Sequence, residues 1–168
     1  MTSYVLPPWP PPDGESRPPL ALSDSPERWL FGLAASREEW PAGEYEFRLP
    51  PCGLPLLIGH EEYSLAPSGR VPGDVGVARR FHEVSEGIVC LAEIGAEFVS
   101  VLWDVAERKR AGLSVKAHLD PPPGGGPTWV YFAEVSLTAT PADRLARVVS
   151  HGKAALEDWQ ALTGEEVS

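Results

Sequence analysis

Apolar and polar residues alternate through much of the middle of the chain. In "LSVKAHL", residues 113–119, every second residue is apolar, which is typical of a strand with one buried face. The apolar run "GIVCLAEIGAEFVSVLWD" precedes it. Gly95 in its middle disfavours a single helix, and the valines and aromatics of its second half favour strands. We therefore expect strands at residues 88–94, 98–105 and 113–119, joined as a three-stranded antiparallel meander.

Four further segments have strand character. The segments "GEYEFRLP" and "TWVYFAEVSLTA" combine alternation with aromatic residues, whereas "LPLLIG" and "VARRFHEV" are short apolar or alternating runs. Gly and Pro recur every few residues in 59–76 and in "DPPPGGGP", which predicts loops.

Two helices are expected at the flanks of this sheet. Ser25 and Pro26 form an N-cap and first-turn pair, which predicts a short helix over 26–36. Thr140 and Pro141 repeat the signal, and apolar residues then recur at helical spacing as far as Gly164. The predicted fold class is α+β: an antiparallel β-sheet (meander) packed by an N-terminal short helix and a long C-terminal amphipathic helix.

The first nineteen residues form a proline-rich arm, so we divide the chain into an arm at 1–19 and a single α+β domain at 20–168. Such an arm is a ligand for an aromatic-lined groove on another protein, or it docks on its own domain through its apolar side chains.

Charge narrows the range of partners. With 24 acidic and 14 basic residues the net charge is -10, which argues against nucleic acid and an anionic membrane as partners. A basic protein surface fits the sign better. Neither a signal peptide nor a membrane span is evident, so a cytoplasmic protein with reduced thiols is expected. The oligomeric state is left open.

Catalytic and metal chemistry has few candidates. The pairs "GHEEYS" and "FHEVSE" contain His60 and His82, the latter followed by Glu83, and their convergence at one end of the sheet would make an acid–base or metal site. Neither pair has metal-ligand spacing, and no phosphate loop or serine elbow is present. We predict no cofactor and no bound metal.

Candidate partner-binding residues are aromatic or acidic. Trp9 and Trp40 each precede proline in irregular segments, and tryptophan is enriched at binding hot spots. The carboxylates of Glu93, Glu97 and Asp104 lie on the predicted sheet and would face a basic partner.

The segment "GIVCLAEIG", followed by "AEFVSVLWDV" and the late helix "ALEDWQAL", resembles the central hairpin and closing segment of SUKH-type immunity proteins. These are small acidic α+β domains that neutralise bacterial toxins. The resemblance covers residues 87–162; the helical N-terminal half and the Leu-Pro signature typical of that family are not evident here. It implies a protein-binding function.

Three functions follow from the sequence. The first is a non-catalytic, acidic protein-interaction protein, such as a toxin-neutralising, immunity-like or assembly factor. The second is a small enzyme or metal-binding protein that uses His60 and His82 with neighbouring carboxylates. The third is a structural subunit that docks through its proline-rich arm.

Overall fold

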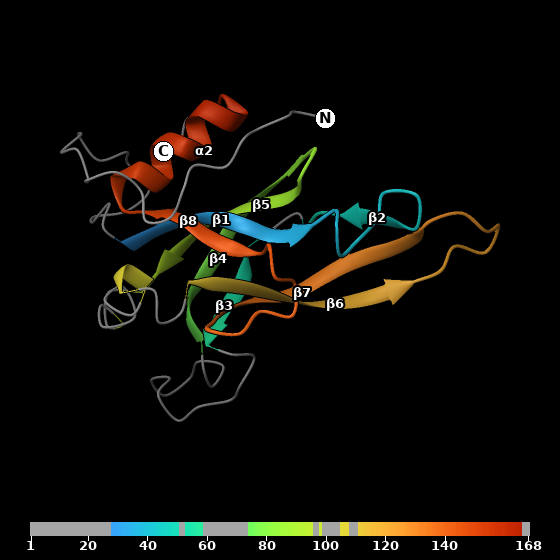
Figure 1. Cartoon of the computed structure of the whole chain (residues 1–168), viewed down its shortest axis with the longest axis horizontal. Helices are drawn as coiled ribbons and strands as arrows, with labels where there is room; N and C mark the ends of the chain where they lie inside the picture. The colour runs from blue at the N-terminus through green and yellow to red at the C-terminus, as the bar shows by residue number, and fades with distance from the viewer. Residues whose placement is uncertain are drawn as a thin grey trace.

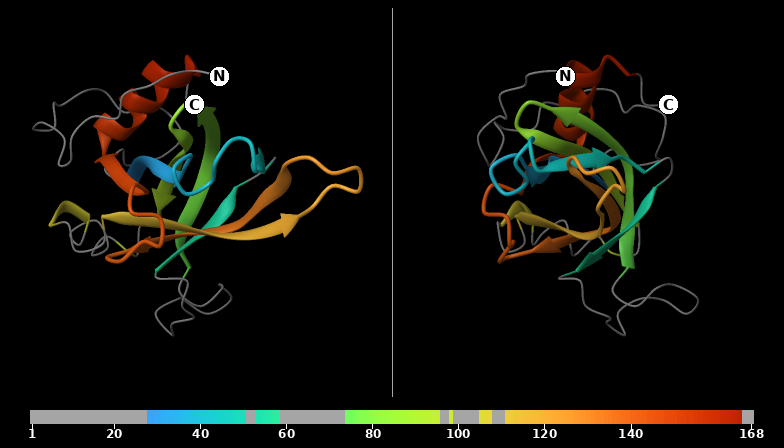
Figure 2. Two further views of the ribbon diagram at one scale, coloured as in Figure 1. Left: turned by 45° about the vertical axis from the view of Figure 1, so that its right-hand side comes forward. Right: turned by 90° about the vertical axis from the view of Figure 1, so that its right-hand side faces the viewer.

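Seven strands close into a β-barrel, with an eighth strand added to one of them (Figures 1 and 2). The computed structural model describes residues 28–50, 53–58, 74–95, 98, 105–107 and 111–165. The elements of this part of the chain are β1 (Trp29–Ser36), β2 (Tyr45–Arg48), β3 (Leu54–Ile58), β4 (Asp74–Val84), β5 (Gly87–Ile94), β6 (Gly112–Asp120), β7 (Thr128–Thr138), β8 (Arg147–His151) and α2 (Lys153–Thr163).

The strands follow the order β7-β3-β4-β5-β1-β8-β6, and β6 pairs with β7 to close the ring. Most neighbours are antiparallel, but β3 and β2 both run parallel to β7, at its end and at its start respectively. The closure is narrowest between β6 and β8, which share only the pair of Gly112 and Arg147.

The predicted α+β meander is therefore wrong. β5 pairs with β4 and β1, while β6 pairs with β7 and β8, so the strands expected to be neighbours lie apart in the ring. Of the strand expected at 98–105, Phe98 lies in a single 3-10 turn and Val105 in a helical turn; the residues between them lie outside the described part of the chain. Alternation identified most strands but carried no information about which strands pair.

The expected N-terminal helix is also wrong, because its residues form β1. Trp29, Phe31 and Leu33 face the helix α2, and Leu30 and Ala34 face the barrel interior. All eight residues of β1 are buried. A strand covered on both faces shows no polar alternation, so its apolar run looks like a helical stripe.

The residues predicted to form one long C-terminal helix instead form the strand β8 and the shorter helix α2. Val148 points into the barrel and Val149 toward α2, as alternating strand residues do. Asp143 would lie in the first turn of a helix that begins at Pro141. It instead accepts hydrogen bonds from the backbone N–H of Ser36 at 2.6 Å and from its hydroxyl at 2.8 Å. The end of the helix agrees with the prediction, because Gly164 caps α2 in a left-handed conformation.

Buried residues form three clusters. The first fills the barrel with small and branched side chains, and the second joins the outer faces of β1 and β5 to α2 through Trp29, Phe31 and Trp159. The third is aromatic and lies where β2, β6 and β7 meet the barrel. None of the helices in the described residues has the length and apolar character needed to cross a membrane.

Candidate interaction surface

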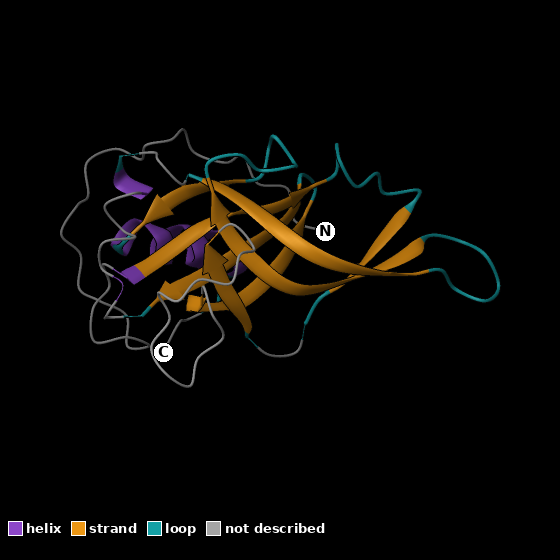
Figure 3. Ribbon diagram, turned by 90° about the horizontal axis from the view of Figure 1, so that it is seen from below, coloured by secondary structure: helices purple, strands orange, loops and turns teal. Residues whose placement is uncertain are grey.

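The hairpin of β6 and β7 extends beyond the barrel and carries β2 along its side (Figures 1 and 3). We call this extension the ribbon and define it as residues 45–48, 117–120 and 128–132. Its three strands are in register, with β7 in the middle. Side chains directly opposite one another on paired strands share a face of a sheet, so the pairing determines which residues form each face of the ribbon.

One face of the ribbon is open to solvent. Across it, His118 pairs with Tyr131 and Tyr131 with Arg48, while Asp120 pairs with Trp129 and Trp129 with Glu46. Trp129 is half-buried, Tyr131 is 38% exposed, and the other four are exposed. We call these six residues the outer ribbon face: Glu46, Arg48, His118, Asp120, Trp129 and Tyr131.

The aromatic rings of this face are held by their neighbours. The Arg48 guanidinium lies over the indole of Trp129 at 4.4 Å from the ring centroid, and it pairs with Glu46 at 2.9 Å. The rings of His118 and Tyr131 lie 6.5 Å apart. A cation above an indole ring is an attractive arrangement that limits the motion of both groups, so these two aromatic side chains are presented in a defined orientation.

The opposite face of the ribbon is anchored to the barrel. Phe47 of β2 and Phe132 of β7 pack at 5.6 Å between ring centroids, and Phe132 contacts Phe81 of β4 at 5.9 Å. Val130 is buried in the same cluster. Because this apolar face packs on the barrel, the outer face keeps a fixed position relative to it.

Two residues proposed from the sequence, Trp40 and Glu83, belong to this anchor. Arg37 donates hydrogen bonds to the carbonyl oxygens of Trp40 at 3.2 Å and Tyr45 at 3.1 Å, and its other terminal nitrogen binds the Glu83 carboxylate at 2.7 Å. The half-buried Trp40 ring packs edge-on against Tyr45 at 5.0 Å. Both side chains thus hold β2 and the preceding loop in place.

His82 lies elsewhere, on the outer side of β4. It pairs with Val89 of β5, and its ring meets Trp159 of α2 edge-on at 6.3 Å. Its Nε2 atom is buried and has no hydrogen-bond partner among the described residues. Within that part of the chain, no three His, Cys, Asp or Glu side chains gather closely enough to hold a metal ion.

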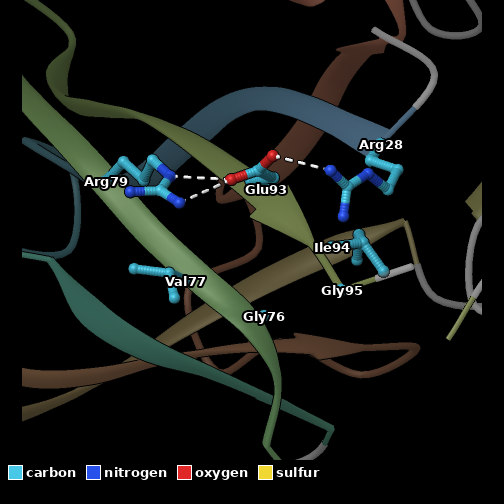
Figure 4. A pocket seen from close by; sticks show the side chains of 7 residues that line it. All are labelled: Arg28, Gly76, Val77, Arg79, Glu93, Ile94 and Gly95. Carbon is cyan, nitrogen blue, oxygen red and sulfur yellow. Dashed lines mark hydrogen bonds and ion pairs between the residues drawn. The ribbon is translucent and has the colours of Figure 1, made fainter. Parts of the chain in front are cut away.

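Glu93 is buried in an ion-pair cluster (Figure 4). Arg79 binds one carboxylate oxygen through Nε at 2.8 Å and a terminal nitrogen at 2.7 Å, and Arg28 approaches the other oxygen at 3.3 Å. The three side chains line a pocket of about 360 Å³ together with Gly76, Val77, Ile94 and Gly95. The carboxylate therefore joins the residue before β1 to β4 and β5.

The remaining candidates lie outside the described residues: His60, Trp9, Glu97 and Asp104. Their roles stay predictions, as does the convergence of His60 with His82. Cys90 is buried in the barrel, and this burial raises the pKa of its thiol to about 12. A thiol with so high a pKa is a poor nucleophile at neutral pH.

Sequence reasoning missed the outer ribbon face. None of Trp129, Arg48 and Tyr131 was a candidate for partner binding. The signal that was present in the sequence is the pair of large aromatics at positions 129 and 131, which lie on one face of a predicted strand. The sequence did not show that β2 pairs in parallel with β7, which places Arg48 beside Trp129 and Tyr131.

No protein-family model matches this chain, and no curated protein matches its sequence. The likeness of residues 87–162 to SUKH-type immunity proteins therefore has no support from either comparison. Its implied α+β fold also differs from the barrel.

Proposed function

We propose that this chain is a non-catalytic interaction protein that binds another protein through its outer ribbon face. The observation that carries the proposal is the pair of half-buried Trp129 and exposed Tyr131, oriented by Arg48 and His118 on an element that projects from the barrel. Tyr, Trp and Arg are the residue types most enriched at binding hot spots. A pre-oriented set also loses less conformational entropy when a partner binds.

The charge of the chain favours a basic partner. The outer ribbon face carries two carboxylates and one guanidinium, and the whole chain has a net charge of -10. An acidic surface accelerates encounter with a basic protein and disfavours acidic ones. A toxin-neutralising or assembly role fits a partner of this kind, and we place the encounter in the cytoplasm, where the thiol of Cys90 stays reduced.

The proposal is tested by capture followed by direct measurement. The immobilised full chain is incubated with extract of the native host, beside a Trp129→Ala/Tyr131→Ala variant and a Leu145→Ala control. Leu145 is a suitable control because it is also an exposed apolar residue, at 41%, but lies outside the ribbon. Proteins retained by the wild type and the control, but lost by the double variant, are then purified.

Affinities are measured with each purified partner in low and high salt. We expect the double variant to bind at least about tenfold more weakly, since removal of one hot-spot side chain costs 2 kcal/mol or more. For a basic partner the association rate should fall with salt. Equal affinity of all three chains for every purified partner would refute a role for the outer ribbon face.

A further inference from the structure

Among the described residues, one edge of β6 has no paired strand for most of its length. β6 pairs with β7 at every residue from Gly112 to Asp120. On its other side it meets β8 at Gly112 alone. Two hydrogen bonds flank this pair, from the Leu113 N–H to the Ala146 carbonyl at 3.2 Å and from the Val148 N–H to the Ala111 carbonyl at 2.6 Å. From residue 114 to residue 120, no strand of the described chain lies on that side. An unprotected strand edge readily accepts another strand.

The direction of the Leu113 N–H shows which groups the edge presents. Because backbone groups alternate sides along a strand, the N–H and C=O of Val115, Ala117 and Leu119 point the same way as those of Leu113. The register irregularity in this hairpin falls on β7, where Ala133 is the extra residue, so the alternation of β6 is not interrupted. The available donors end at Pro121, which has no N–H.

We propose that two copies of this chain associate by antiparallel pairing of their β6 edges about a two-fold axis at His118. In this register Lys116 of each copy lies opposite Asp120 of the other, which gives two ion pairs on one face. Leu119, which is 46% exposed, lies opposite Ala117 of the second copy on the other face and is covered by it. The order of charged and apolar residues along β6 is self-complementary, so it favours a second copy of β6 as the strand that pairs with this edge.

Neighbouring registers are less favourable. If the axis moves to Ala117, Lys116 faces His118 and Asp120 faces Ser114, so neither ion pair forms. If the axis moves to Leu119, Lys116 faces Pro122 and Asp120 faces His118, so again neither ion pair forms. Charge therefore selects the axis at His118, and in this register the hydrogen-bonded ladder ends where Pro121 lies opposite Val115.

The association should be weak, because five residues per strand bury far less than the roughly 1,600 Å² of a standard interface. We expect a dissociation constant of roughly 100 µM. The repulsion between the net charges of the two copies is largely screened beyond about 8 Å at 0.15 M salt. The paired ribbons would form one continuous sheet, in which the Trp129 and Tyr131 side chains of both copies share a face. This proposal rests on the β6 edge and not on the proposed function.

Sedimentation equilibrium of the full chain, from about 10 µM to 1 mM in 0.15 M salt, tests the proposal. Lys116→Asp and Asp120→Lys each place like charges opposite one another twice, so each should weaken self-association by roughly tenfold. The double variant Lys116→Asp/Asp120→Lys exchanges the charges and should restore it to within about threefold of the wild type. Both positions are exposed, so the fold should tolerate the changes; circular dichroism checks this.

Three results would overturn the proposal: a wild-type monomer at 1 mM, single variants that associate as the wild type does, or a double variant as weak as the singles. Leu145→Ala, an exposed apolar change away from the edge, should leave the equilibrium unchanged. Partner binding through Trp129 and Tyr131 is measured on Lys116→Asp, because Lys116 lies outside the outer ribbon face, so failure of the edge pairing is distinguished from failure of the proposed function.

Discussion

The guanidinium of Arg48 lies over the indole ring of Trp129, 4.4 Å from its centroid, and joins β2 to β7 on the outer ribbon face. We expect Arg48→Ala to leave the fold nearly intact, with a loss of at most about 1 kcal/mol in the free energy of unfolding, because an exposed cation–π contact contributes about that much. The indole of Trp129 should lose its fixed orientation. In an NMR spectrum of labelled protein, the Trp129 indole N–H signal should shift and sharpen.

Arg144→Ala is the matched control, since Arg144 is 88% exposed and pairs with Glu38 at 3.7 Å, outside the ribbon. Its loss should leave the Trp129 signal unchanged. A Trp129 signal that is the same in the wild type and in Arg48→Ala would show that Arg48 does not orient the ring.

Gly32 lies where β1 packs directly against β8. A Cβ atom at this position would lie 2.4 Å from the Arg147 carbonyl oxygen and 2.7 Å from a methyl carbon of Leu113. We expect Gly32→Ala to lower the free energy of unfolding by about 1–3 kcal/mol, because the two strands must separate to accept the methyl group. Urea unfolding measures the loss.

Gly43→Ala provides the comparison, because a Cβ atom there would meet nothing within 4 Å. It should change stability by less than about 0.5 kcal/mol. Equal effects of the two substitutions would mean that the contact between β1 and β8 does not limit the size of residue 32.

The strands were more predictable than their arrangement. β6 falls where the alternation of residues 113–119 placed it, because one of its faces is polar. β1 and β8 were read as helices, because each is covered on one side by the barrel core and on the other by α2. In such strands the period-two signal disappears, and burial by distant segments decides the structure. The barrel closure depends on contacts between residues far apart in sequence, which a local pattern does not encode.

The candidate site was less predictable still. Glu93 was chosen as an exposed carboxylate, yet Arg28 and Arg79 surround it. Arg79 lies on β4, one neighbour of β5, and Arg28 precedes β1, the other neighbour, whose Trp29 pairs with Glu93. Conversely, Trp129 and Arg48 are 81 positions apart in sequence, and only the parallel pairing of β2 with β7 brings them together. The type of each residue indicated what chemistry it could perform. Whether its side chain is exposed to solvent depends on how the strands pair, which the sequence did not show.

Glu93 should be required for stability. Glu93→Gln removes the negative charge but keeps the shape of the side chain, and it leaves the Arg79 and Arg28 guanidinium groups facing a neutral amide. Because breaking a buried ion pair leaves an uncompensated charge, we expect a loss of about 2 kcal/mol in the free energy of unfolding. Urea unfolding at pH 7 measures it, with Glu44→Gln at an exposed position as the control. Similar stability of both variants would show that the cluster contributes little.

The thiol of Cys90 makes stability depend on alkaline pH. Burial raises its pKa from 9.0 to about 12 in the folded chain, so between these values the unfolded state loses a proton that the folded state keeps. The stability from this group is complete below pH 9 and falls as pH rises, by at most about 1.4 kcal/mol per pH unit. Urea unfolding at pH 8.5 and 10.5 should show a larger loss for a Cys52→Ser chain than for Cys52→Ser/Cys90→Ala. In the Cys52→Ser chain a thiol reagent should modify Cys90 only after unfolding; rapid modification of the folded chain, or equal pH slopes in the two variants, would contradict the burial of this thiol.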